Sequence, residues 1–172
     1  MAEPGEPVAG ALGPRDVDAL FDGWEAAWSG RDPDAFAPLC DPAVQYEDPL
    51  AREPLVGVEE LVGHVERLWT GFPDARLERA GARLADGRFA VAPCKLSATH
   101  REAVDGLPAT GRFIVVHGVF YCELRAQRLL RVRAFFDLYD AAIQLGVLPR
   151  PGTLGEKALL TLRGFGLRAR GA

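Results

Sequence analysis

Asp137 is a carboxylate at the end of an apolar run, in the stretch RAFFDLYDAAIQLGVLP that spans residues 133–149. Aspartate is among the residues that are least often fully buried without a partner. If Asp137 lies beside Phe135 and Phe136 in a closed cavity, loss of hydration raises its pKa and makes it a better general base near neutral pH. The alternative role is structural, because aspartate is a favoured N-cap and a helix is predicted to begin at the next residue.

The strand predicted just before Asp137 has two faces, because side chains alternate along a strand. One face carries Leu130, Val132, Ala134 and Phe136, and the other carries Arg131, Arg133, Phe135 and Asp137. The aspartate is thus grouped with two arginines. Either the strand bends before Asp137, or Arg133 reaches into the same pocket, where its charge would lower the pKa of the carboxyl group.

Further polar side chains are expected at strand ends and within strands. Tyr46 and Asp48, in QYEDP, end a short predicted strand and can reach the mouth of a cavity. Tyr46 is suited to donate a hydrogen bond to a developing oxyanion, or it is a core tyrosine with a satisfied hydroxyl. His100 ends another strand, and His117 lies mid-strand on a largely apolar face. A lone strand histidine is more often a hydrogen-bonded structural residue than a catalyst.

Four large aromatic residues are predicted to be core or cavity wall. They are Trp24, Trp28, Trp69 and Phe72. Such a lining also suits a flat, apolar ligand. The sequence therefore favours an apolar pocket with few polar groups.

Several kinds of chemistry find no support in the sequence. The histidines His64, His100 and His117 have no metal-ligand spacing with one another or with the cysteines, so no metal is predicted. His64 is predicted to lie at the surface or boundary of its helix. Cys40, Cys94 and Cys122 form no CxxC pair and are predicted to be reduced thiols packed as small apolar side chains. We find no Gly-rich phosphate loop and no nucleophile elbow.

Composition predicts one domain with tails. The chain has 172 residues, 48% of them hydrophobic, and a formal charge of -4, which argues against nucleic acid as the main partner. No apolar run is long enough to span a bilayer. The acidic N-terminus, rich in proline and glycine, lacks the features of a signal peptide. These observations predict a cytoplasmic protein.

The periodicity predicts helices first and strands afterwards. The expected helices cover 14–30, 32–40 and 56–74, with a short closing helix over 138–146. The expected strands cover 43–48, 75–86 (with a bulge at Gly81), 89–100, 112–124 and 128–137. This order predicts an α+β fold in which helices pack on one face of a curved antiparallel sheet.

The ends of the chain differ from the domain that is predicted over residues 14–149. Residues 1–13 are expected to be disordered, and residues 150–172 form a basic extension that is expected to be helical. The apolar residues of the extension predict a helix docked on the domain or on a partner subunit. A helix on a membrane surface is a second reading, which the short length and the glycines of this segment disfavour.

Four stretches together resemble the SnoaL-like polyketide cyclase family, also called ester cyclase-like. They are YEDP (46–49), GFPD (71–74), THREAVDGLPATGR (99–112) and the stretch around Asp137. The resemblance covers roughly residues 14–149 and implies the cone-shaped nuclear transport factor 2-like fold, in which a curved antiparallel sheet is wrapped by helices around a deep pocket. It also implies a homodimer packed through the sheets.

The resemblance further implies a reaction. Founding members of the family close a ring by intramolecular aldol condensation of a polyketide ester, with an aspartate as acid/base and no cofactor. Matched motif by motif, that aspartate is Asp137, and His100, Tyr46 and Asp48 fall on family positions. The chain departs from the family at Ala98, where a glycine is usual, and in LPATGR, where PPTGR is usual. Both changes reshape the pocket.

Three functions follow from these observations. The first is acid/base chemistry on a small hydrophobic carbonyl compound, as in a cyclase or a ketosteroid isomerase, with Asp137 as base and His100 or Tyr46 holding the enolate. The second is epoxide hydrolysis by a set made of Asp137, Arg133 and Asp48 around one water. The third is a non-catalytic protein that binds a small ligand or dimerises. The expected substrate-binding residues are Asp48, Trp24, Trp28, Trp69, Phe72, His117, Arg133 and Phe135.

Overall fold

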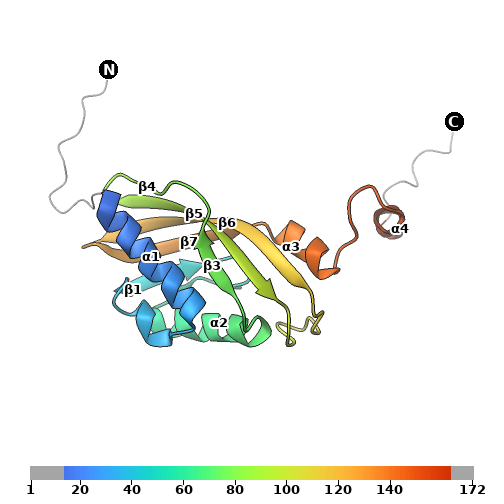
Figure 1. Ribbon diagram of the computed structural model, residues 1–172, viewed down its shortest axis with the longest axis horizontal. Helices are drawn as coiled ribbons and strands as arrows, with labels where there is room; N and C mark the ends of the chain where they lie inside the picture. The colour runs from blue at the N-terminus through green and yellow to red at the C-terminus, as the bar shows by residue number, and fades with distance from the viewer. Residues whose placement is uncertain (1–13, 164–172) are drawn as a thin grey trace, which may run out of the picture.

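Seven strands form one curved sheet in the computed structural model, which describes residues 14–163 of the chain (Figure 1). The strands follow the order β2-β1-β7-β6-β5-β3, and β4 pairs with β5. Their bounds are β1 Cys40–Glu47, β2 Leu55–Val56, β3 Arg76–Arg79, β4 Leu84–Ala85, β5 Phe89–Thr99, β6 Phe113–Arg125 and β7 Arg128–Phe136. The predicted α+β fold with a curved sheet is confirmed.

The sheet is mixed, whereas the sequence predicted an antiparallel one. β1 runs parallel to β7, with Tyr46 opposite Val132, and the other pairs are antiparallel. Hydrophobic alternation fixes which face a side chain occupies but carries no information about the direction of a neighbouring strand. The segment expected as one strand over 75–86 is divided around Gly81 into β3 and β4.

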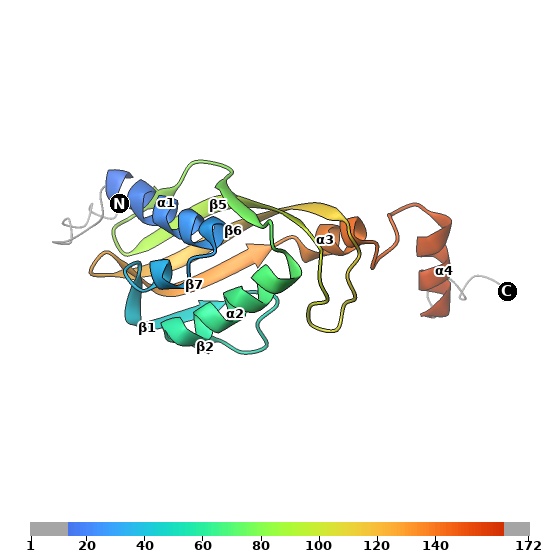
Figure 2. The same cartoon turned by 60° about the horizontal axis from the view of Figure 1, so that its bottom comes forward.

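Five helical segments lie in the described part of the chain, and all except α4 cover the concave face of the sheet or one of its ends (Figure 1). They are α1 Pro14–Gly30, the 3₁₀ helix η1 Pro33–Phe36, α2 Val58–Gly71, α3 Leu138–Leu145 and α4 Leu154–Leu162. Figure 2 shows α1 and α2 on the same side of the sheet. α1 packs against β3 and β4, whereas α2 packs against β1 and β2. α3 follows β7 directly and packs on β6, so it closes one end of the concave side.

The core lies between these helices and the sheet, and aromatic rings fill its centre. Trp24 is fully buried, and its ring meets those of Phe36 and Phe120 edge to face at centroid distances of 5.3 and 5.8 Å. This arrangement is one of the geometries that aromatic pairs prefer. The predicted apolar stripe of α1 is therefore confirmed as core.

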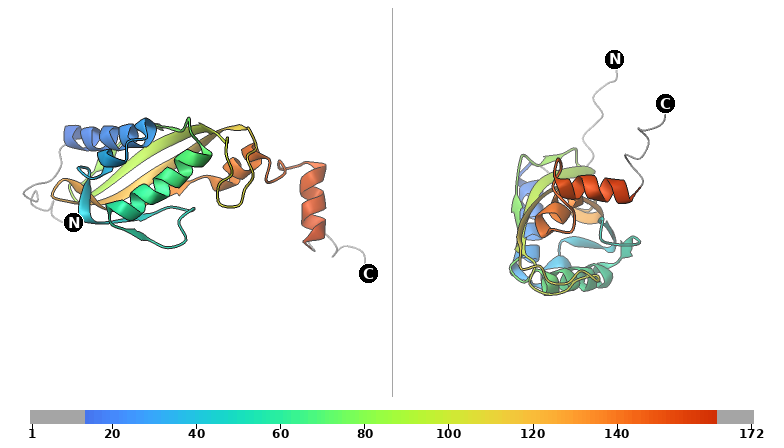
Figure 3. Two further views of the ribbon diagram at one scale, coloured as in Figure 1. Left: turned by 90° about the horizontal axis from the view of Figure 1, so that it is seen from below. Right: turned by 90° about the vertical axis from the view of Figure 1, so that its right-hand side faces the viewer.

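The C-terminal extension leaves the domain after α3. The left view of Figure 3 shows α4 standing apart from the sheet, and its residues Leu154 and Leu162 are exposed. The predicted docking of this helix on the domain is not what the structure shows. The predicted disordered segment 1–13 lies outside the described residues. None of the helices in the described part of the chain is long and apolar enough to cross a membrane.

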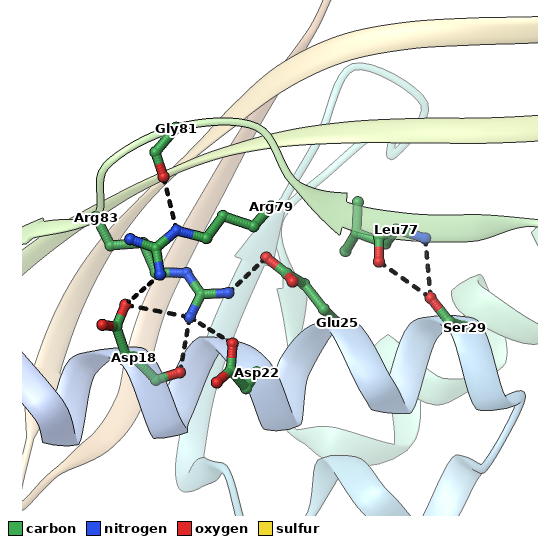
Figure 4. Close-up of polar contacts among 8 residues, drawn as sticks. All are labelled: Asp18, Asp22, Glu25, Ser29, Leu77, Arg79, Gly81 and Arg83. Carbon is green, nitrogen blue, oxygen red and sulfur yellow. Dashed lines mark hydrogen bonds and ion pairs between the residues drawn. The ribbon is translucent and has the colours of Figure 1, made fainter.

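A buried arginine fastens α1 to the segment between β3 and β4 (Figure 4). The Arg83 side chain is only 1% exposed, and its guanidinium pairs with Asp22 at 2.7 Å and with Glu25 at 2.8 Å. It also donates to the backbone oxygen of Asp18 at 2.7 Å. Because these acidic residues recur every three to four positions, they share one face of the helix. Arg83 thus holds one wall of the core in place.

Replacing Arg83 with methionine is expected to lower the free energy of unfolding by about 2 kcal/mol, because Glu25 loses its partner in a largely buried position. Urea unfolding of the full chain measures this loss. The matched control is Arg79→Met, since Arg79 also pairs with Asp18 but is 45% exposed, and an exposed pair contributes about 0–1 kcal/mol. Equal losses for the two variants would contradict the prediction.

Candidate functional site

An apolar cavity of about 310 Å³ lies between α1, α2, α3 and the sheet. Apolar side chains make up most of its wall, among them Leu68, Leu96, Ile114, Val116, Phe120 and Phe136. Leu68 comes from α2, and the sheet supplies the others from its concave face, because inward and outward side chains alternate along each strand. The volume lies at the lower end of the range for sites that bind small molecules.

Two charged side chains line this cavity, Asp48 and Asp105. Asp105 is exposed and lies in the loop between β5 and β6. Asp48 directly follows β1, and its side chain is only 4% exposed. Among the residues that the structure describes, Asp48 is therefore the one buried carboxylate on the wall of this cavity.

Four hydrogen bonds hold the Asp48 carboxylate. The backbone N–H groups of Leu50 and Ala51 donate to Oδ1 at 2.8 and 2.7 Å. The Tyr46 hydroxyl and His64 Nε2 approach Oδ2 to 3.0 and 2.7 Å. Since a carboxylate offers about four acceptor positions, these bonds fix both its position and its orientation.

A polar chain runs from Asp48 through α2 to the surface. Arg67 Nη2 lies 2.8 Å from His64 Nδ1. Because arginine can only donate, Nδ1 is the acceptor, and the ring proton is on Nε2, where it is donated to Asp48. His64 is buried, so the prediction that it lies at the surface or boundary of its helix was wrong. His64 lies three residues after Leu61 and four before Leu68, on the apolar stripe of the helix. This spacing could have predicted from the sequence that the side chain is buried.

The electrostatics of this network favour a charged Asp48. Burial alone raises the pKa of the carboxyl group, but the hydrogen bonds from His64, Leu50 and Ala51 outweigh burial and hold the pKa below its usual value. The pKa of Tyr46 is shifted upward instead, because burial and the adjacent Asp48 raise it well above the usual range. At neutral pH the pair is therefore a carboxylate and a neutral phenol.

Asp137 lies outside this cavity. Its side chain is exposed, and its Oδ1 accepts a hydrogen bond from the backbone N–H of Asp140 at 2.9 Å, so it is the N-cap of α3. The closed apolar environment expected around Asp137 is therefore absent. Side chains alternate between the two faces of β7, and Asp137 continues the face that points away from the cavity. The two phenylalanines before it separate, with Phe136 on the cavity wall and Phe135 exposed.

Three other predicted binding residues also lie on the outer face of the sheet. His117 is exposed, and its register partner is Lys95. Arg133 is paired with Glu47 at 3.2 Å, and Phe135 is 56% exposed. Because Arg133 and Asp48 lie in separate surroundings, the structure does not bring together the Asp–Arg–Asp set expected for an epoxide hydrolase.

The remaining predicted residues lie on or behind the cavity wall. Trp28, Trp69 and Phe72 line the cavity, as Asp48 does, whereas Trp24 is packed in the core. Tyr46 is a core tyrosine with a satisfied hydroxyl, the second of the two roles expected for it, since it is fully buried and its hydroxyl is bonded to Asp48.

His100 lies one layer behind the cavity wall. It is fully buried, and its ring stacks on Phe72 at a centroid distance of 4.9 Å. The backbone N–H of Thr110 donates to its Nδ1 at 3.3 Å. The ring therefore supports a residue of the cavity wall and fastens the loop that follows β5.

The cysteines are free and buried, as predicted. Burial raises the pKa of the Cys40 and Cys94 thiols to about 12, so both are protonated at neutral pH and pack as apolar groups. Within the described residues, no group of three histidine, cysteine, aspartate or glutamate side chains is arranged to hold a metal ion.

Comparisons with known structures reveal a shared fold. TsrD from Streptomyces laurentii is 23% identical, with 80% of this chain and 99% of TsrD covered at a TM-score of 0.71. IdmH from Streptomyces antibioticus, described as a candidate polyketide cyclase, is 20% identical, with 76% of this chain and 98% of IdmH covered at a TM-score of 0.66. A Catenulispora acidiphila protein with a ketosteroid isomerase-like fold is 16% identical, with 74% of this chain and 92% of that protein covered at a TM-score of 0.63. At these identities the likeness shows the nuclear transport factor 2-like fold.

The family assignment comes from the sequence itself. A comparison with curated proteins gives no match. The family model described as SnoaL-like polyketide cyclase matches residues 19–145, which is well over half of the chain. The match contains most of α1, all of α2 and α3 and the strands, and so includes every residue that lines the cavity except Val147. The chain therefore belongs to the SnoaL-like polyketide cyclase family.

Proposed function

We propose that this protein is a cofactor-free acid/base enzyme that acts on a small hydrophobic carbonyl compound, by chemistry of the cyclase or ketosteroid isomerase kind. One observation carries the proposal: a single buried, ionised carboxylate, Asp48, lies on the wall of an otherwise apolar cavity. Such a carboxylate can remove a proton from the carbon next to a ketone, and the apolar wall excludes competing water. The geometry thus favours Asp48 as the base, in place of the exposed Asp137.

The Tyr46 hydroxyl makes this proton transfer possible. All four acceptor positions of Asp48 are occupied, so one hydrogen bond must change when the carboxylate takes a proton. A hydroxyl hydrogen can rotate and its oxygen can accept, so the bond of 3.0 Å between Tyr46 and Oδ2 can reverse its direction. The protonated carboxyl group then donates to Tyr46, and its other three contacts are unchanged.

The test is hydrogen–deuterium exchange at the carbon next to a ketone. The probe is 2-tetralone, a flat, apolar bicyclic ketone, incubated with the full chain in D₂O and followed by proton NMR. Exchange faster than in buffer alone, and slowed by excess tetralin as an unreactive competitor for the cavity, would support the proposal. The absence of any enhancement with saturating 2-tetralone would contradict it.

A second candidate is binding of an apolar ligand without chemistry. It is favoured by one observation, the complete set of hydrogen bonds on Asp48, which is also typical of a structural carboxylate. The same experiment separates the two candidates, because a carrier would bind 2-tetralone without accelerating its exchange.

We also propose a homodimer formed through the outer face of the sheet. Val119 lies opposite both Pro93 and Phe135 in the strand register, and Phe113 and Tyr121 extend the exposed apolar surface along β6. An apolar patch of this kind on a sheet is typical of an interface between proteins. This partner is a second copy of the chain.

Phe135→Glu is expected to convert the dimer into a monomer, because the change places a charge within this patch, beside Val119. Sedimentation equilibrium of the full chain measures the mass directly. Phe135→Leu is the matched control and should remain dimeric, since it keeps the surface apolar. A monomeric wild-type chain, or a dimeric glutamate variant, would refute the interface.

A further inference from the structure

We propose that Arg67 is a positioning residue for the proposed reaction, which acts through His64 to keep a neutral hydrogen-bond donor, rather than a cation, beside Asp48. This role deepens the proposed function and rests on it for the assignment of Asp48 as the base. It depends on one atom, Nδ1 of His64, which cannot take a proton while Arg67 donates to it.

An exposed guanidinium contacts the buried ring of His64. Arg67 and His64 are three positions apart on α2, so their side chains are neighbours on the helix. Arg67 is exposed, whereas the His64 side chain is only 1% exposed. Nη2 of Arg67 lies 2.8 Å from Nδ1, and Nε2 on the other side of the ring lies 2.7 Å from Oδ2 of Asp48. The ring therefore bridges a surface cation and the carboxylate on the cavity wall.

The two partners of the ring act on different protons. Asp48 is ionised and can only accept, so it is sufficient to keep a proton on Nε2. A carboxylate also favours the charged form of a neighbouring imidazole, so Asp48 promotes the uptake of a second proton at Nδ1. Arg67 opposes this uptake in two ways, because its N–H uses the lone pair of Nδ1 and its charge repels an imidazolium. Arg67 is therefore the residue that keeps His64 neutral.

The other charged groups on the elements around His64 are engaged elsewhere or exposed. The helix α2 packs against β1, β2 and η1, and the Tyr46 ring of β1, a neutral phenol, lies 5.9 Å from the His64 ring between centroids. The acidic residues of these elements are Glu47 and Asp41, paired with Arg133 and Arg125, Glu60, which accepts from the N–H of Val56, and the exposed Asp34, Glu59 and Glu66. The charge state of His64 is thus governed by Asp48 and Arg67.

A neutral donor serves the proposed base better than a cation does. An imidazolium at His64 would form an ion pair with Asp48, and an adjacent positive charge lowers the pKa of an aspartate by about 1–3. Asp48 would then remove a proton from a ketone more slowly, because the rate of proton transfer falls with the strength of the base. Arg67 does not line the cavity, so it sustains the basicity of Asp48 without touching the ligand.

The charge state of His64 can be measured without a ligand. The chain has three histidines, so ¹⁵N-labelled full-length protein gives three pairs of ring-nitrogen signals, and His64→Gln assigns the pair of His64. In the wild-type chain, Nδ1 should keep the signal of an unprotonated nitrogen from pH 8 to pH 5. In Arg67→Met, this signal should change to that of a protonated nitrogen as the pH falls through about 6.5.

Two matched variants accompany Arg67→Met. Arg67→Lys should restore the wild-type signal, because an ammonium group also carries a charge and can only donate. Arg79→Met makes the same change at another exposed arginine, which pairs with Asp18, and should leave the His64 signals unchanged. A His64 spectrum in Arg67→Met that matches wild type at every pH would overturn the inference.

The exchange of 2-tetralone gives the second readout. At pH 5.5, Arg67→Met should exchange 2-tetralone about tenfold more slowly than wild type, and at pH 8 the two rates should agree within about twofold. The dissociation constant of 2-tetralone should be unchanged, and Arg67→Lys should recover the rate at pH 5.5. An equal loss of rate at both pH values would indicate a purely structural role and overturn the inference. The expected His64 spectra without any exchange in the wild-type chain would instead refute the proposed function alone.

Discussion

Asp48→Asn is expected to slow the exchange of 2-tetralone about 1,000-fold, because an amide cannot take the proton that the carboxylate removes. The estimate follows from the usual contribution of a positioned general base, about 10² to 10⁴ in rate. Proton NMR in D₂O measures the exchange rates of 2-tetralone with the wild-type chain and with Asp48→Asn. The expected result assigns the chemistry to the buried carboxylate rather than to the one singled out by the sequence.

Asp137→Asn is the matched control. Asparagine caps helices about as well as aspartate, so the variant keeps α3 and removes only the charge. Its exchange rate should be within about twofold of wild type. A large loss in Asp137→Asn with a normal rate in Asp48→Asn would restore the sequence-based assignment. Because an amide beside His64 and two backbone donors can disturb the fold, 2-tetralone binding to Asp48→Asn must also be measured, and it should persist.

The pH dependence provides a second check on Asp48. Its pKa is held below the usual value of 3.8, so the group stays ionised from neutral pH down to that value. The exchange rate should therefore be independent of the protonation of Asp48 above about pH 4, and should fall as the pH drops through the lowered pKa. A rate that begins to fall near pH 6 would indicate a base with a raised pKa, contrary to this assignment.

The sequence was informative where periodicity determines structure. The helix α1 has the bounds expected from its stripe, and the long strands β5, β6 and β7 begin and end within one residue of expectation. The same alternation placed Asp137 with Arg133 and Phe135, and the structure keeps this grouping on the outer face. Local patterns thus fixed the face that each side chain occupies, which is a property of the strand itself.

The candidate site was harder to predict, because it depends on which elements meet. The contact of His64 on α2 with Asp48 after β1 joins residues that are 16 positions apart, and no local pattern specifies it. The pocket was expected beside Phe135 and Phe136 as a pair, but only Phe136 reaches it.

Gly118→Ala is expected to be the most destabilising of the small substitutions, because the strand β6 has no room for a side chain at this position. A Cβ atom built there would lie 2.4 Å from Cδ1 of Phe136 and 2.8 Å from the backbone oxygen of Phe135. The ring can rotate away, but only by entering the cavity or the core, and the backbone oxygen cannot yield without shifting β7. Overpacking of this kind costs about 1–3 kcal/mol, and the backbone clash places Gly118→Ala at the upper end.

Thermal unfolding followed by circular dichroism measures this loss as a fall in Tm of about 6–12 °C, from the usual 2–4 °C per kcal/mol in a chain of this size. Gly63→Ala is the matched control with the opposite sign. Gly63 lies on the exposed side of α2 with no atom near its added Cβ, so alanine should raise the stability by about 1 kcal/mol. An unchanged Tm in Gly118→Ala would mean that β7 can move away from β6. Phe136, the wall that β7 contributes to the cavity, would then be adjustable rather than fixed, and the cavity would admit ligands broader than its present shape.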